Sequence, residues 1–142
     1  MNRPLIFAAL ASLVWGLAPA LEKAGLKGRI DPYLGVVVRT LSIAAAALIG
    51  LALMGRLRAI TAVDPKSAFF VGAGGIVAGL IGQLAFYSAL KSGEASVVVP
   101  VAATYPLVAL LVSVFFLGEA FTLQKLIGIG LVVGGVVILN AG

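Results

Sequence analysis

The sequence predicts an all-α integral membrane protein with five transmembrane helices. Of its 142 residues, 62% are hydrophobic and 11% are charged, whereas a soluble domain is about 45–50% apolar and about 25% charged. The charged residues also leave long apolar runs between them, which is the pattern of membrane-spanning helices. These two observations exclude an ordinary soluble fold.

The five spans follow one another with short polar links. Pro4 is suited to the first turn of the first helix. The N-terminal apolar run continues past Trp15 without a small-residue cleavage site, so we interpret this segment as a span and not as a signal peptide. Thr122 is a suitable N-cap for the fifth span, which is a few residues shorter than the roughly 20 that cross the hydrocarbon. We predict spans at residues 4–24, 33–54, 67–90, 96–117 and 122–139, within a single transmembrane domain over residues 1–142.

The composition argues against an enzyme. The chain has no cysteine and no histidine, and it has only five acidic residues. It therefore lacks thiol nucleophiles, the usual general base and the usual metal ligands. We expect no catalysis, metal or cofactor. The net charge is +5. The basic residues lie at span ends, where they anchor to headgroups, so we do not expect nucleic-acid binding.

The fourth span contains two prolines, Pro100 and Pro106, with Thr104 and Tyr105 between them. Proline removes a backbone donor and clashes with the preceding turn, so the freed carbonyls need other partners. One interpretation is an interrupted helix that lines a pathway, with Pro106 as its hinge. The other is that these are ordinary prolines of a membrane helix.

A layer of polar groups is predicted inside the membrane. Arg39 lies about 10 Å into the second span, and a charge at that depth is a functional-site candidate unless its side chain extends to the interface. Because successive spans alternate in direction, polar and helix-breaking positions of three other spans fall at a similar depth. Such convergence is typical of a small-molecule pocket. The candidate substrate-binding residues are Arg39, Trp15, Gln83, Tyr87, Thr104 and Pro100.

The acidic residues at span ends are weaker candidates. Glu22 and Lys23 end the first span, where a solvated interfacial pair is the simpler interpretation. If the first span tilts inward, Glu22 is instead the candidate ion-coupling group of a carrier. Glu119 follows Gly118 between the last two spans, and we expect it to have a structural role near the start of the fifth span.

Glycine pairs and the charge distribution bear on assembly. Gly75 with Gly79, and Gly130 with Gly134, form GxxxG pairs that let helix backbones approach closely in lipid. We favour packing within the subunit for the first pair, and leave dimerisation open for the second. Five basic residues fall on the N-terminal side and four on the other, so the sequence permits insertion in both orientations. The five are Arg3, Arg56, Arg58, Lys66 and Lys125, and the four are Lys23, Lys27, Arg29 and Lys91.

Several motifs resemble the EamA-type proteins of the drug/metabolite transporter superfamily. The resemblance covers essentially the whole chain and is most specific in its second half. Its motifs are Trp15-Gly16, Lys23-Ala-Gly-Leu-Lys27-Gly, Asp31-Pro32, Arg39, Tyr87-x-Ala89-Leu90-x-x-Gly93-x-Ala95-Ser96-Val-Val-Val-Pro100 and Phe116-Leu-Gly-Glu119-x-x-Thr122.

The resemblance implies an architecture. Larger members have ten spans in two five-span halves, and an odd span number inverts the second half relative to the first. This chain resembles one such inverted repeat, a half-size member. It would rebuild the transporter as a homodimer of two antiparallel copies with dual topology, in the inner (plasma) membrane of a prokaryote.

The sequence and the resemblance leave three hypotheses for the function. The first is a small-metabolite transporter that works by alternating access, in which Arg39 favours a substrate with a carboxylate or phosphate. The second is a lipid-linked-sugar flippase or another lipid handler, which needs a lateral opening between helices. The third is a non-transporting membrane scaffold packed through its glycine faces. An exporter of quaternary cations fits less well, because it needs a carboxylate at mid-depth and Glu22 lies at a span end.

Overall fold

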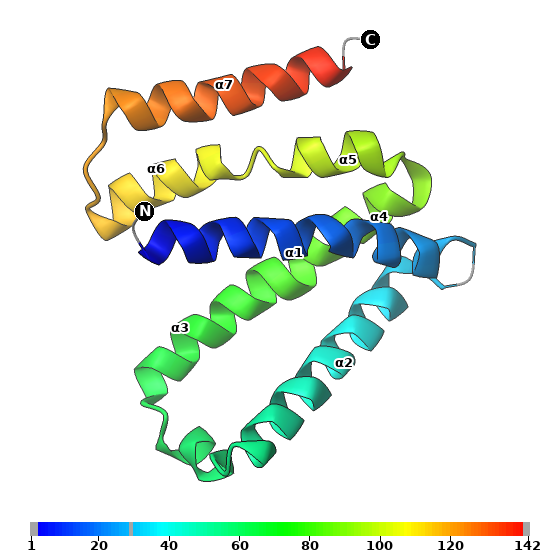
Figure 1. Ribbon diagram of the computed structural model, residues 1–142, viewed down its shortest axis with the longest axis vertical. Coiled ribbons are helices and arrows are strands. Elements are labelled where there is room, and N and C mark those ends of the chain that lie inside the picture. The colour runs from blue at the N-terminus through cyan, green and yellow to red at the C-terminus, as the bar shows by residue number, and fades with distance from the viewer. Residues whose placement is uncertain (1–2, 29, 141–142) are drawn as a thin grey trace. The chain divides into compact units, whose positions relative to one another are not determined.

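The computed structural model describes residues 3–28 and 30–140, and every regular element in these ranges is a helix (Figure 1). The all-α fold class is therefore confirmed. The helices fall into two compact units that divide between Ser92 and Gly93, and the single-domain organisation stays a prediction. The elements are α1 (Arg3–Leu26), α2 (Pro32–Leu53), η1 (Leu57–Ala62), α3 (Pro65–Gly75), η2 (Ile76–Gly82), α4 (Gln83–Ser92), α5 (Ala95–Ala102), α6 (Pro106–Leu117) and α7 (Leu123–Asn140).

The number and placement of the apolar helices agree with the predicted spans. Within the described residues, four helical segments are long and apolar enough to cross a membrane, and a shorter fifth covers Leu123–Leu139. The four are Arg3–Leu26, Pro32–Leu53, Pro65–Ser92 and Ala95–Leu117. Their outward faces are rich in exposed Leu, Val, Ile and Phe, as lipid contact requires.

Two helix starts in the first unit share one capping device. Asp31 accepts a hydrogen bond of 3.1 Å from the backbone N–H of Leu34, and Asp64 accepts one of 2.8 Å from Ser67. Each aspartate is followed by a proline in the first turn of its helix, where the missing N–H costs nothing. The Asp-Pro pairs thus fix where α2 and α3 begin.

The first unit is tightly packed at one end only. At this end the C-terminus of α1, the start of α2 and α4 meet, and the buried side chains there are Leu26, Val36, Tyr87 and Leu90. Gly35 permits the contact, because a Cβ added to it would lie 2.9 Å from Leu26 Cδ2 and 3.0 Å from Tyr87 Cδ2. From this end α2 and α3 lead away to the link between them (Figure 1).

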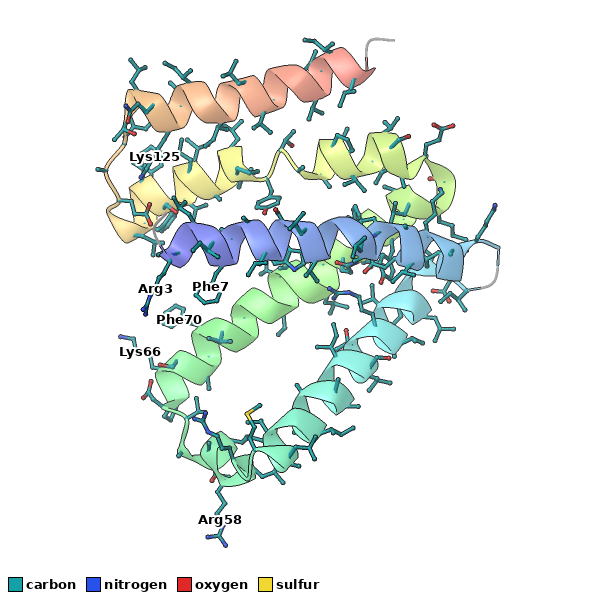
Figure 2. All side chains as sticks on the ribbon, viewed as in Figure 1. Arg3, Phe7, Arg58, Lys66, Phe70 and Lys125 are labelled. Atoms are coloured by element: carbon teal, nitrogen blue, oxygen red, sulfur yellow. The ribbon has the colours of Figure 1, made fainter. Side chains whose placement is uncertain are left out.

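Basic side chains mark the link between α2 and α3. Figure 2 shows Arg58 extending outward from this link and Lys66 from the first turn of α3. Both are exposed, as the sequence predicted for charges at span ends.

The third span is one rod built from α3, η2 and α4. Its central segment, η2, is π-helical over Ile76–Gly82. Gly75, Gly79 and Gly82 lie in or beside this segment and weaken its preference for the α-helical form. A π-helix has more residues per turn than an α-helix. Residues after η2 therefore lie on a different face of the span from the one that an uninterrupted α-helix would give them. The segment therefore sets the direction in which Gln83 and Tyr87 point.

The second unit contains the interrupted span and α7. α5 ends at Ala102 and α6 begins at Pro106. The carbonyl of Ala102, which Pro106 cannot bond, accepts from the N–H of Tyr105 at 3.2 Å. The predicted interruption between the prolines is therefore present, while the hinge role of Pro106 stays a prediction.

The connection from α6 to α7 is compact. Gly118 ends α6 in the left-handed conformation (φ 68°), which glycine adopts without steric cost. Thr122 accepts from the N–H of Lys125 at 3.3 Å, as predicted for an N-cap, and Lys125 Nζ lies 3.5 Å from Glu119. Glu119 therefore lies in the turn before α7, as predicted from its position after Gly118.

Candidate functional site

Glu22 is the centre of a polar cluster between three helices of the first unit. Its Oε1 atom lies 3.3 Å from Arg39 Nε. The same oxygen accepts hydrogen bonds from the hydroxyl of Tyr87 at 3.0 Å and from the amide of Gln83 at 3.4 Å. The Glu22 side chain is only 15% exposed. One carboxylate oxygen thus joins α1, α2 and α4.

The tightly packed end of the unit holds these side chains in place. Gln83 and Tyr87 are four residues apart and therefore lie on one face of α4. Tyr87 is 4% exposed, with its ring against Gly35. Arg39 follows Gly35 by one turn of α2, so the turn that packs closely on Tyr87 also brings the guanidinium to Glu22.

The charges in this cluster compensate each other. Glu22 and Arg39 both lie within segments long enough to span the membrane. An isolated charge there costs at least a few kcal/mol, and two opposite charges in contact reduce this cost only if hydrogen bonds satisfy the remaining polar groups. The Tyr87 and Gln83 donors contribute such bonds. The formal charges of Glu22 and Arg39 sum to zero.

The structure corrects the simpler interpretation of Glu22. An interfacial pair with Lys23 was expected, but Glu22 pairs with Arg39, and Lys23 Nζ donates to the carbonyl of Leu90 at 2.9 Å. Consecutive residues of a helix point in different directions, so Glu22 faces α2 and Lys23 reaches the end of α4. Similarly, Lys91 Nζ donates to the carbonyl of Ile30 at 3.1 Å. Lys23 therefore joins α1 to the last turn of α4, and Lys91 joins α4 to the link before α2.

A groove of about 540 Å³ lies beside the cluster, between α2 and the rod of α3 and η2. Arg39 and Thr40 are the polar side chains among its described lining residues. The remaining lining is aliphatic or glycine, including Leu41, Ile76 and Gly79. Arg39 therefore belongs both to the ion pair and to the wall of an apolar groove.

The structure brings three of the six predicted substrate-binding residues together, namely Arg39, Gln83 and Tyr87. Trp15 lies on α1 two turns before Glu22, and its side chain is 66% exposed. Thr104 and Pro100 belong to the second unit, where the Thr104 hydroxyl donates to the Val101 carbonyl at 2.8 Å and Pro100 lies inside α5. Whether any of the six contacts a substrate stays a prediction.

The glycines predicted to pack closely have open surroundings in this structure. A Cβ added at any of the four would meet no heavy atom within 4 Å. Their packing role stays a prediction. The four are Gly75, Gly79, Gly130 and Gly134. Gly35, which the sequence reasoning missed, is the glycine in close contact; it belongs to no GxxxG pair, so no pattern pointed to it.

The described residues contain no group of side chains that could hold a metal ion. Among residues 3–28 and 30–140, no three side chains of His, Cys, Asp or Glu lie close enough together to hold a metal ion. The cluster around Glu22 is instead suited to hydrogen bonding and charge exchange, because it combines one acid, one guanidinium, one amide and one phenol.

An all-helical chain with several apolar spans and an ion pair within them defines a multi-pass integral membrane protein. Residues 2–141 match the EamA-like transporter family. The chain therefore belongs to this family, which suggests a membrane transporter of the drug/metabolite transporter superfamily.

A relative of unassigned function also matches. The chain is 41% identical over 61 residues to a protein of Methanocaldococcus jannaschii described as uncharacterised. The match covers 43% of this chain and 44% of that protein. No solved structure matches the chain significantly.

Proposed function

We propose that the protein transports a small metabolite by alternating access, as a homodimer of two copies in opposite orientations. Membership of a transporter family supports transport as the general activity. The observation that supports a site is the convergence of Arg39, Gln83 and Tyr87 on Glu22. Intramembrane charges are rare outside pathways and binding sites.

The chemistry of the cluster favours a substrate with a carboxylate or phosphate. The guanidinium of Arg39 matches the geometry of such groups, and Gln83 and Tyr87 add neutral donors beside it. Trp15 on the same side of α1 would contribute an apolar wall. Thr104 and Pro100, in the second unit, stay predicted substrate-binding residues, and the interrupted span would bend at Pro106 during transport.

The five-span repeat and its charges support the antiparallel homodimer. A second copy would supply the other repeat, and an odd span number makes that copy inverted. The five-to-four distribution of basic residues would permit insertion in both orientations. In the dimer, two such clusters would flank the midplane of the membrane.

Two measurements test this proposal together. Purified protein in proteoliposomes is assayed for uptake of a panel of amino acids and phosphorylated metabolites, with empty liposomes as the control. Topology is mapped with a single cysteine placed at either end of the chain, since the native sequence has none. We expect uptake of at least one substrate and labelling of each terminus from both sides. Labelling from one side only would contradict the antiparallel arrangement.

The groove supports lipid handling as a second candidate. Its aliphatic lining suits an acyl or prenyl chain, and Arg39 at its wall suits the phosphate of a lipid headgroup. A lipid handler should copurify with a bound lipid, which mass spectrometry detects. Gly79→Leu, which would fill the groove, should remove that lipid, whereas Gly16→Leu on α1 should not. Lipid retained in both variants would exclude the groove as its site.

A further inference from the structure

The ion pair between Glu22 and Arg39 restricts the conditions under which Arg39 can bind an anion. In the empty site, the carboxylate of Glu22 is the counter-charge of Arg39, at 3.3 Å. An anion that approaches Arg39 meets a neutralised guanidinium and a repelling carboxylate. Arg39 can therefore accept an anion only when the charge of Glu22 is removed.

A proton removes that charge. One proton taken from water onto the carboxylate gives a neutral acid and breaks no other covalent bond. Arg39 keeps its charge, since a guanidinium does not lose its proton in proteins. The hydrogen bonds from Tyr87 and Gln83 weaken when their acceptor becomes neutral, so these donors become available to the oxygens of an incoming anion.

We propose that Glu22 and an anionic substrate exchange on Arg39, so that one proton and one monoanion are bound and carried together. This inference rests on the proposed transport function and adds the coupling ion and the charge of the substrate. The empty site contains one carboxylate and one guanidinium, and the loaded site contains one neutral acid, one guanidinium and one monoanion. Both states have zero net charge, which avoids the cost of moving a net charge through the hydrocarbon.

The contacts of the other charged groups on the three helices support Glu22 as the group that exchanges with the anion on Arg39. Lys23 and Lys91 donate to backbone carbonyls at the helix ends, and Arg3 and Tyr33 lie exposed near the starts of their helices. The described titratable side chains of α1, α2 and α4 are Arg3, Glu22, Lys23, Tyr33, Arg39, Tyr87 and Lys91. Of these, Arg39 and Tyr87 contact Glu22.

Binding of methanesulfonate to the full-length protein in lipid nanodiscs tests the exchange without transport. This monoanion keeps its charge over the working range of about pH 5 to 9. Calorimetry in two buffers of different ionisation enthalpy gives the number of protons taken up per anion. We expect the wild type to take up roughly one proton per anion at alkaline pH, and its affinity for the anion to fall as the pH rises.

Variants isolate the two partners. Glu22→Gln should bind methanesulfonate about tenfold or more tightly than the wild type at alkaline pH, with no proton uptake and no dependence on pH. Arg39→Gln should lose binding. Glu119→Gln is the matched control, because Glu119 is also an ion-paired glutamate, 3.5 Å from Lys125 and 53% exposed, and it should behave as the wild type.

The outcomes separate this inference from the transport proposal. Anion binding without proton uptake in the wild type would overturn the exchange, and so would a Glu22→Gln protein that binds no anion more tightly than the wild type. Metabolite uptake that does not respond to a pH gradient would overturn the exchange and leave transport standing. Proton-linked anion binding in a protein that transports nothing would overturn the transport proposal alone.

Discussion

The ring of Tyr87 lies against Gly35, and the hydroxyl of the same side chain reaches Glu22. A Cβ at Gly35 would lie 3.0 Å from Tyr87 Cδ2, and the hydroxyl donates to Glu22 Oε1 at 3.0 Å. The close packing at Gly35 and the polar cluster therefore share one side chain. Packing at Gly35 thus determines where the hydroxyl points.

Gly35→Ala is expected to destabilise the protein and disturb the cluster. The added methyl group would overlap Leu26 and Tyr87, which are both buried, and overpacking of this kind costs about 1–3 kcal/mol. The measurement is the thermal unfolding midpoint in detergent. Gly16→Ala is the control, because a Cβ there meets nothing within 4 Å. Equal midpoints for the two variants would contradict the close contact.

Tyr87→Phe is expected to weaken the cluster while the ring stays in place. The change removes one hydrogen bond to Glu22, and we expect a loss of about 1–2 kcal/mol in the free energy of unfolding. Unfolding in mixed detergent micelles measures it. Tyr105→Phe, at a tyrosine that is 60% exposed, should change little. If both variants unfold alike, Tyr87 contributes no net stability through Glu22.

The cap at Asp64 is expected to fail in acid. A hydrogen bond from the Ser67 N–H holds the pKa of the Asp64 carboxyl below its ordinary value. A carboxyl with a lowered pKa in the folded state stabilises that state above its unfolded pKa, and this contribution disappears as the pH falls through the folded pKa. Hydrogen exchange at Ser67 should therefore stay protected at neutral pH and lose protection in strong acid.

A cap that does not titrate provides the control for this prediction. Asp64→Asn keeps a good capping side chain and removes the carboxyl. In that variant, the protection of Ser67 should not depend on pH over the same range. Loss of protection in acid by both proteins would show that something other than Asp64 titrates there.

Hydropathy and proline placement predicted the spans and the interruption of the fourth, because burial in lipid and the missing proline N–H act locally along the chain. Depth along each span placed Arg39, Gln83 and Tyr87 in one predicted group of six, and the structure brings these three together. Depth does not specify the direction in which a side chain points around the helix axis, so Glu22 was placed with Lys23 at the interface. The tilt and rotation of α1 that turn Glu22 toward Arg39 arise from packing.

Other features depend on contacts that no local pattern reports. Gly35 is in close contact because Tyr87 and Leu26 happen to face it, whereas the glycine pairs that do form a pattern have open surroundings. The π-helical form of η2 is also absent from the predictions, since glycine weakens the α-helix without specifying the alternative. Both features bear on the position of Tyr87.

Pro106→Ala is expected to join α5 and α6 and slow transport. Alanine restores the N–H that could bond the carbonyl of Ala102, and it removes the ring that clashes with the preceding turn. Substrate affinity should change less than the transport rate, because a hinge acts on the conversion between states. Proteoliposome kinetics measures both quantities. Pro65→Ala, at the first turn of α3, is the control, and an equal effect there would remove the hinge assignment.

The most direct test of the proposed function is uptake of the transported metabolite by Arg39→Gln in proteoliposomes. Arg58→Gln is the matched control, since Arg58 lies exposed in η1 outside the spans. A binding site at the Glu22–Arg39 pair predicts that Arg39→Gln loses uptake by about tenfold or more, while Arg58→Gln keeps it. Uptake by Arg39→Gln equal to that of the wild type, for every substrate that the protein transports, would contradict the site.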